Sequence, residues 1–301
     1  MPADAVRKEK PRLYPFYGYL GIGIVAAAEW LLFSGNSLVG HWFTPIVWTG
    51  YILSVDAIVF KLKGGSLLTT NRLELVIIAL ASIAFWWLFE LYNAPRFWRS
   101  NLELWWHYHD LEPNLFLRRV GYDWAFATIF PALFETAEFL ALSVFANRQQ
   151  HRAIRLSKPT LLTIVIIGAA GAILPLLFPT DRFAPVIWLA YVLLLDPVNA
   201  LRGWPSIVGD LGRGEWQRLL SLLASGLACG GLWEFWNYWA LSKWTYTVPY
   251  FGNIKIFEMP VLGYFGFPPF AVECWAMYIF YRSFLTPKPP RLEQQNGIWL
   301  E

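Results

Sequence analysis

The sequence predicts an all-α integral membrane protein with eight transmembrane helices, arranged as two tandem four-helix repeats in parallel orientation. Three observations lead to this fold class: long apolar runs, basic residues sorted between alternate loops, and an internal repeat. Of the 301 residues, 56% are hydrophobic and only 15% are charged. A soluble protein carries roughly 25% charged residues, so the composition favours a lipid environment.

Eight apolar runs approach the roughly 20 residues that a helix needs to cross a hydrocarbon core. The alternation of apolar and polar residues that is typical of membrane β-strands is absent. Each run is therefore interpreted as a transmembrane helix. The runs are residues 14–33, 43–60, 75–93, 122–146, 160–178, 184–201, 219–241 and 262–284.

The basic residues predict the orientation of these helices. With eight spans, 17 of the 24 lysines and arginines fall on the side that holds both termini, and 7 fall on the other side. Cytoplasmic loops carry an excess of Lys and Arg, so we expect an inner (cell) membrane protein with both termini in the cytoplasm. Because the basic residues follow the membrane sides, the net charge of +3 does not indicate nucleic-acid binding.

The two halves of the sequence resemble each other. FTPIVWTGYILSVDAIVF (43–60) matches FAPVIWLAYVLLLDPVNA (183–200), and LFELYN (88–93) matches LWEFWN (232–237). Shorter matches pair WHY with WTY, and PALFE with PFAVE. We therefore predict one repeat at 1–150 and another at 151–301. An even number of spans per repeat gives both the same orientation, related by a pseudo-twofold axis along the membrane normal.

The repeat retains three pairs of intramembrane acids, which are functional candidates because a buried charge is costly in lipid. Asp56 and Asp196 lie near helix ends and are interpreted as structural anchors. The remaining candidates are acids, with amides and aromatic residues nearby in the sequence. They are Glu90, Glu135, Glu234 and Glu273 as catalytic residues, and Asn93, Asn237, Trp106, Tyr108, Trp244 and Tyr246 as substrate-binding residues.

These residues fit either a functional site or a satisfied structural network. We expect Glu234, Asn237 and Glu273 to line one polar pocket in the outer half of the membrane, roofed by Trp244 and Tyr246. The Trp-rich connections 94–121 and 242–261 fit either an interfacial aromatic belt, which could include a short amphipathic helix, or a lid over a lipophilic or cationic ligand. No metal or cofactor is predicted. His107 and His109 are two residues apart, which does not place them on one helical face.

Part of the second half resembles the tandem membrane lycopene cyclase domains of carotenoid synthesis. The resemblance rests on WNYWALSKWTYTVPYFGNIKIF (236–257) followed by PPFAVE (268–273). It departs from that family in having a single Glu273 where the family has two acids, and in having four spans per repeat instead of three. The resemblance implies an enzyme that protonates a polyene and guides a carbocation, with glutamates as acids and aromatic faces as stabilisers.

Three functions remain open from the sequence. The first is an enzyme that acts on a lipophilic, isoprenoid-like substrate by acid-initiated cyclisation or isomerisation. The second is a proton- or cation-coupled transporter, and the third is a structural or assembly subunit of a membrane complex. The expected partners are membrane lipids or a lipophilic small molecule, with a membrane-protein partner or a homo-oligomer also open, and no nucleic acid.

Overall fold

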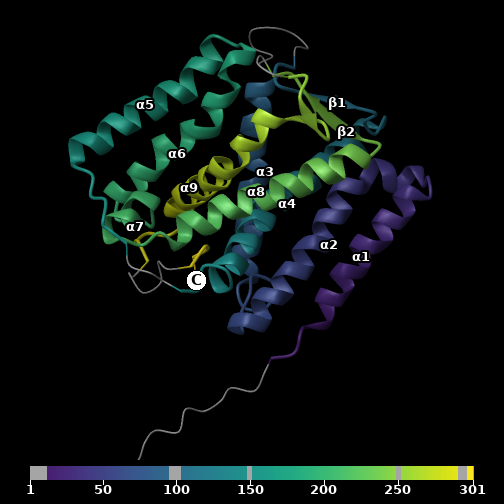
Figure 1. Cartoon of the computed structure of the whole chain (residues 1–301), viewed down its shortest axis with the longest axis horizontal. Helices are drawn as coiled ribbons and strands as arrows, with labels where there is room; N and C mark the ends of the chain where they lie inside the picture. The colour runs from purple at the N-terminus through teal and green to yellow at the C-terminus, as the bar shows by residue number, and fades with distance from the viewer. Residues whose placement is uncertain (1–11, 95–102, 148–150, 249–251, 291–296, 301) are drawn as a thin grey trace, which may run out of the picture.

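The computed structural model describes residues 12–94, 103–147, 151–248, 252–290 and 297–300 (Figure 1). Long helices form most of this part of the chain, and they coincide with the eight apolar runs of the sequence. The helices are α1 (Phe16–Phe33), α2 (Ser37–Lys63), α3 (Arg72–Asn93), α4 (Leu115–Leu142), α5 (Lys158–Leu177), α6 (Ala184–Leu201), the short α7 (Ile207–Arg213), α8 (Gln217–Trp239) and α9 (Phe267–Leu285).

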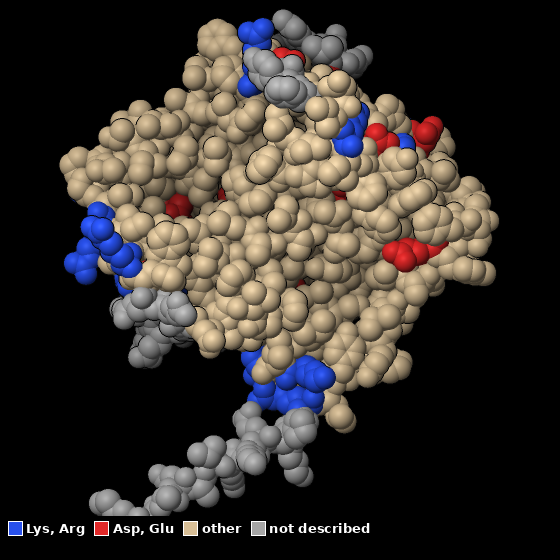
Figure 2. All heavy atoms as spheres, in the orientation of Figure 1, with Lys and Arg blue, Asp and Glu red and all other residues tan. Residues whose placement is uncertain are grey.

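Seven of these helices, α1 to α6 and α8, are long and apolar enough to cross a membrane. By length and composition the chain is therefore a multi-pass membrane protein. The face shown in Figure 2 agrees, because its middle is mostly uncharged and Lys and Arg gather toward its edges. Helix α9 is not among these seven, and it carries Glu273 and Arg282. It is also almost enclosed by other helices, since residues 270–279 are all buried, so it has little need of lipid-facing apolar side chains.

Capping asparagines explain why two helices begin before the predicted apolar runs. Helix α2 begins at Ser37 because Asn36 accepts a hydrogen bond from the Val39 amide at 3.0 Å. Helix α4 begins at Leu115 because the Asn114 side chain accepts from two amides of its first turn. Such caps satisfy N–H groups that have no partner inside the helix.

The two halves of the chain pack alike. Helix α1 lies along α2 as α5 lies along α6, α2 packs on α4 as α6 packs on α9, and α3 packs on α4 as α8 packs on α9. Helices α4 and α8 join the two halves. Small residues permit the closest approaches, as is common in membranes: a Cβ added to Gly168 of α5 would lie 2.3 Å from the Leu194 backbone nitrogen of α6.

Short strands occur in the connections between helices, where the sequence indicated an aromatic belt, a short helix or a lid. Strand β1 (Trp106–His109) pairs antiparallel with β2 (Lys243–Tyr246), and β3 (Lys255–Ile256) pairs with β4 (Met259–Pro260). Aromatic residues and Thr favour strands, and β1 and β2 consist largely of them. The β1–β2 ribbon thus links the connections of the two halves, although residues 95–102 and 249–251 lie outside the described part.

Candidate functional site

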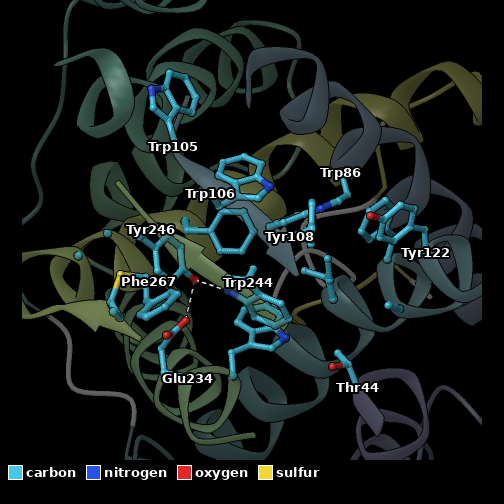
Figure 3. A pocket seen from close by; sticks show the side chains of 18 of the residues that line it. Thr44, Trp86, Trp105, Trp106, Tyr108, Tyr122, Glu234, Trp244, Tyr246 and Phe267 are labelled. Carbon is cyan, nitrogen blue, oxygen red and sulfur yellow. Dashed lines mark hydrogen bonds between the residues drawn. The ribbon is translucent and has the colours of Figure 1, made fainter. Parts of the chain in front are cut away.

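A cavity of about 460 Å³ lies beside the β1–β2 ribbon, and side chains from both halves line it (Figure 3). Its volume is typical of sites for small molecules, which are mostly apolar with a few polar groups. Aromatic rings dominate the lining. They include Trp86, Trp105, Trp106, Tyr108, Tyr122, Phe126, Trp188, Trp233, Trp244, Tyr246, Phe267 and Phe270.

Two asparagines fix the ribbon to the ends of α3 and α8. The Asn93 side chain donates to the Trp106 carbonyl at 2.8 Å and accepts from the amides of Trp105 and Trp106 at 2.9 and 3.0 Å. Asn237 donates to the Trp244 carbonyl at 2.7 Å and accepts from the Trp244 amide at 2.9 Å. Neither asparagine lines the cavity. The sequence placed both in substrate binding, but here they position the aromatic strands.

Glu90 is held by three donors on one carboxylate oxygen. Tyr108 donates its hydroxyl at 2.5 Å, and the indoles of Trp86 and Trp106 donate at 3.0 and 3.1 Å. Burial, and then the neighbouring Glu90 carboxylate, raise the pKa of Tyr108 well above its usual value. Tyr108 therefore remains a hydroxyl donor at neutral pH. Glu90 does not line the cavity.

Glu234 is the corresponding residue of the second half, and it lines the cavity. Its Oε1 accepts a hydrogen bond from the Tyr246 hydroxyl at 2.7 Å, and Tyr246 in turn accepts from the Trp244 indole at 2.6 Å. Burial and the Glu234 carboxylate raise the pKa of Tyr246 well above its usual value, so Tyr246 also remains a donor. The Oε2 atom of Glu234 is buried and has no hydrogen-bond partner.

Two differences separate the surroundings of Glu90 and Glu234. The Trp106 indole donates to Glu90, whereas the matching Trp244 indole donates to the Tyr246 hydroxyl. The spacing that pairs Glu90 with Glu234 pairs Trp86 with Gly230. Gly230 has no indole to donate, and the Phe267 ring occupies the adjacent space, within 2.2 Å of a Cβ built on Gly230. Glu234 therefore lacks a counterpart of the bond that Trp86 donates to Glu90 Oε1.

Glu273 lies outside the cavity lining, which corrects the expectation of one pocket shared by Glu234, Asn237 and Glu273. Glu273 faces α6 instead, where its Oε1 accepts from the Tyr191 amide at 2.7 Å. The position of α9 explains this, because that helix packs against both α6 and α8. Of the expected site, the structure gathers only Glu234, Trp244 and Tyr246 from this half around the cavity, with Trp106 and Tyr108 from the other half.

Glu135 is fully buried on α4, away from the cavity lining, and neither of its oxygens has a donor. Its charged neighbours include Asp56. Asp56 accepts from the Leu68 amide, and Asp196 accepts from the amides of Ile207 and Val208. The two aspartates thus hold the chain that follows their helices, as the sequence suggested.

The two ribbon histidines pair with threonines across the strands. The Nε2 atom of His107 lies 2.7 Å from the Thr247 hydroxyl, and that of His109 lies 2.8 Å from the Thr245 hydroxyl. Within the described ranges, no group of three or more His, Cys, Asp or Glu side chains could hold a metal ion.

Neither family models, nor curated proteins, nor solved structures match this chain.

The site around the cavity has a defined chemistry. It combines one buried carboxyl that has an unpartnered oxygen, a tyrosine that donates to the other oxygen, and a wall of aromatic rings. Sequence reasoning missed Trp86, Phe267 and Phe270, which lie in helices and carry no polar pattern. Trp188 matches Trp48 in the aligned segment, but Trp48 does not line the cavity, so the match did not indicate a site.

Proposed function

We propose that this protein is a membrane enzyme that binds a lipophilic, isoprenoid-like substrate in the aromatic cavity and starts its cyclisation or isomerisation with a proton from Glu234. The observation that carries the proposal is Glu234 itself: it lines a largely aromatic cavity, and its buried Oε2 atom has no hydrogen-bond partner. An ionised carboxylate with an unpartnered oxygen is costly away from water. The neutral acid, with its proton on Oε2, costs less free energy to bury than the carboxylate. It is also the form that can donate a proton to an alkene.

The proposed step balances without a cofactor. The Glu234 Oε2–H bond breaks, its proton forms a C–H bond with one alkene carbon, and the π electrons of that alkene supply the new bond. The resulting cation lies among electron-rich rings, which stabilise positive charge. Tyr246 stabilises the new carboxylate by donating to Oε1. Loss of a proton from the rearranged cation returns Glu234 to its starting form, so the product is an isomer of the substrate.

The proposal includes the repeat architecture, with eight spans and both termini cytoplasmic. The ribbon supports it: residues 106–108 correspond to 244–246, and the register pairs Trp106 with Tyr246 and Tyr108 with Trp244. If the two halves are exchanged, the pair Trp106–Tyr246 becomes Trp244–Tyr108, and the reverse. A twofold axis through the pair His107–Thr245 has this effect. The similar packing of the two helix sets and the sorting of basic residues point the same way.

The matched variants Glu234→Gln and Glu90→Gln test this function. The purified protein is extracted with organic solvent and the extract analysed by mass spectrometry, and an acyclic polyene is then supplied in detergent and its products separated. We expect Glu234→Gln to fold normally and lose about 100-fold or more in conversion, since general acids contribute about that much. Glu90→Gln should retain conversion and unfold more readily. Wild-type conversion by Glu234→Gln would refute the proposal.

A further inference from the structure

Two groups of residues in the cavity lining come from different elements and differ in polarity. The first group, here called the polar portal, is His41, Thr44, Glu112, Arg118 and Ser242. The second group, here called the apolar portal, is Pro185, Leu189, Leu262, Phe265 and Gly266. The polar portal belongs to the beginnings of α2 and α4 and to residue 242 beside the ribbon. The apolar portal lies where α6 begins and where the chain enters α9.

Backbone contacts hold the polar groups at their portal. The Arg118 Nε donates to the Glu112 carbonyl at 2.7 Å, and the Ser242 hydroxyl donates to the Asp110 carbonyl at 2.7 Å. These bonds fix a guanidinium and a hydroxyl at one rim of an otherwise aromatic cavity. Such groups recognise oxygen atoms of a ligand, and a guanidinium does so with several N–H donors.

The apolar portal opens toward the outside of the helix bundle. Leu189 is 44% exposed, Leu262 is 47% exposed and Phe265 is 73% exposed. Together with Pro185 and Gly266 they form a rim without a charged side chain. In a membrane protein, exposed side chains of this kind contact lipid chains. A hydrocarbon chain could leave the cavity here without entering water.

The geometry points to a single-chain amphiphile as the substrate class, threaded through the cavity with its headgroup at the polar portal and its chain leaving through the apolar portal. This inference rests on the proposed function, because it specifies the ligand of the same site. Figure 3 shows Glu234 beside Phe267 and Tyr246, on the opposite side of the view from Thr44 and Tyr122. The acid therefore meets the chain beyond the headgroup.

The threaded arrangement explains both portals at once. A ligand with polar groups at both ends would leave one of them in lipid, and a hydrocarbon without a headgroup would leave Arg118 without a ligand partner. An open apolar end sets no upper limit on chain length. The headgroup must accept hydrogen bonds, which both a hydroxyl and a phosphate do, and the two are distinguished by the probes used below.

Binding can be measured through the cavity tryptophans. Alkan-1-ols, alkyl monophosphates and alkanes of short and long chain length, brominated on the chain, quench tryptophan fluorescence when they bind. The protein is used as the full chain in nanodiscs. The variants are Gly266→Leu at the apolar portal and Arg118→Gln at the polar portal, with Gly23→Leu as the control, because a Cβ on Gly23 meets no atom within 4 Å.

We expect long-chain alcohols or phosphates to bind wild type more tightly than alkanes of equal length. Gly266→Leu should weaken long-chain probes about tenfold and leave short ones unchanged. Arg118→Gln should weaken the headgroup probes about tenfold and leave alkanes unchanged. The tighter of the alcohol and phosphate series identifies the headgroup. If Gly266→Leu does not fold, Leu189→Trp blocks the same rim from an exposed position.

Equal binding of alkanes and amphiphiles would overturn the headgroup assignment, and equal effects of Gly266→Leu on short and long chains would overturn threading. The outcome is separable from the proposed function, because Glu234→Gln removes the acid and leaves both portals intact. If Glu234→Gln converts substrate normally while the portal variants behave as expected, the acid role fails and threading stands. If the portal variants have no effect while Glu234→Gln is inactive, threading fails and the acid role stands.

Discussion

Removing the asparagine side chains that hold the ribbon should destabilise the protein in proportion to the bonds each one makes. Asn93 is fully buried and Asn237 is 1% exposed, so water has little access to either. Asn93→Ala removes one donor and one acceptor and leaves three backbone groups of β1 and its preceding residue without partners. Asn237→Ala leaves two groups of Trp244 without partners.

The expected cost follows from the count of unpaired groups. A buried donor or acceptor that loses its partner costs about 1 to 3 kcal/mol. At about 1.5 kcal/mol per group, the free energy of unfolding should fall by about 4.5 kcal/mol in Asn93→Ala and by about 3 kcal/mol in Asn237→Ala. The Asp variants keep the acceptor oxygens and lose the amide donor, so each should cost less than its Ala counterpart.

Unfolding in detergent, followed by tryptophan fluorescence and circular dichroism, measures these differences. Asn71→Ala is the matched control, because the Asn71 side chain makes no capping hydrogen bond at the start of α3. Stabilities of Asn93→Ala and Asn237→Ala within about 0.5 kcal/mol of wild type would refute the reasoning, since that range is typical of uninvolved surface positions. Equal losses in the two Ala variants would contradict the proportionality to bond count.

Two further predictions concern helix packing and pH. Gly168→Ala should lower the free energy of unfolding by about 1 to 3 kcal/mol, because its new methyl meets the α6 backbone. The control Gly23→Ala should be neutral or slightly stabilising. Equal effects of the two variants on unfolding in detergent would contradict this prediction. Burial raises the pKa of Asp210 from 3.8 to about 6. The native state therefore holds a proton that the unfolded state releases, and stability should fall as pH rises from about 4 to about 6, by at most about 3 kcal/mol. Asp210→Asn should flatten the pH profile in that window, and an unchanged slope would exclude Asp210 as its cause.

The helices were predictable because the apolar runs are long and few polar residues interrupt them. Every predicted span coincides with a helix, and the main differences are at the ends, where the caps Asn36 and Asn114 lie outside the apolar runs. Helix α9 shows the limit of hydropathy: its enclosure by other helices, and not its composition, explains why it tolerates Glu273 and Arg282. That enclosure depends on tertiary packing, which periodicity does not reveal.

The ribbon was not predictable for a different reason. WHYH and KWTY are only four residues each, and the 133 residues 110–242 separate them in the sequence. Short isolated strands are not stable in water by themselves. Asn93 holds β1 at the end of α3, and Asn237 holds β2 at the end of α8. The pairing of the two strands therefore depends on both asparagines. The sequence identified these asparagines as important, but it did not distinguish a ligand contact from a backbone contact.

The difference between Glu90 and Glu234 is the feature that a repeat-based interpretation is least able to detect. The two positions match in the sequence, and each accepts a hydrogen bond from the corresponding tyrosine. Resemblance alone would assign them equal roles. Replacement of Trp86 by Gly230 at the preceding turn removes one donor, and Phe267 then fills the space beside the second carboxyl. The two matching positions thus hold one carboxyl that accepts three hydrogen bonds beside the ribbon, and one that accepts from Tyr246 and lines the cavity. Under the proposed function, Glu90 supports the ribbon and Glu234 supplies the proton.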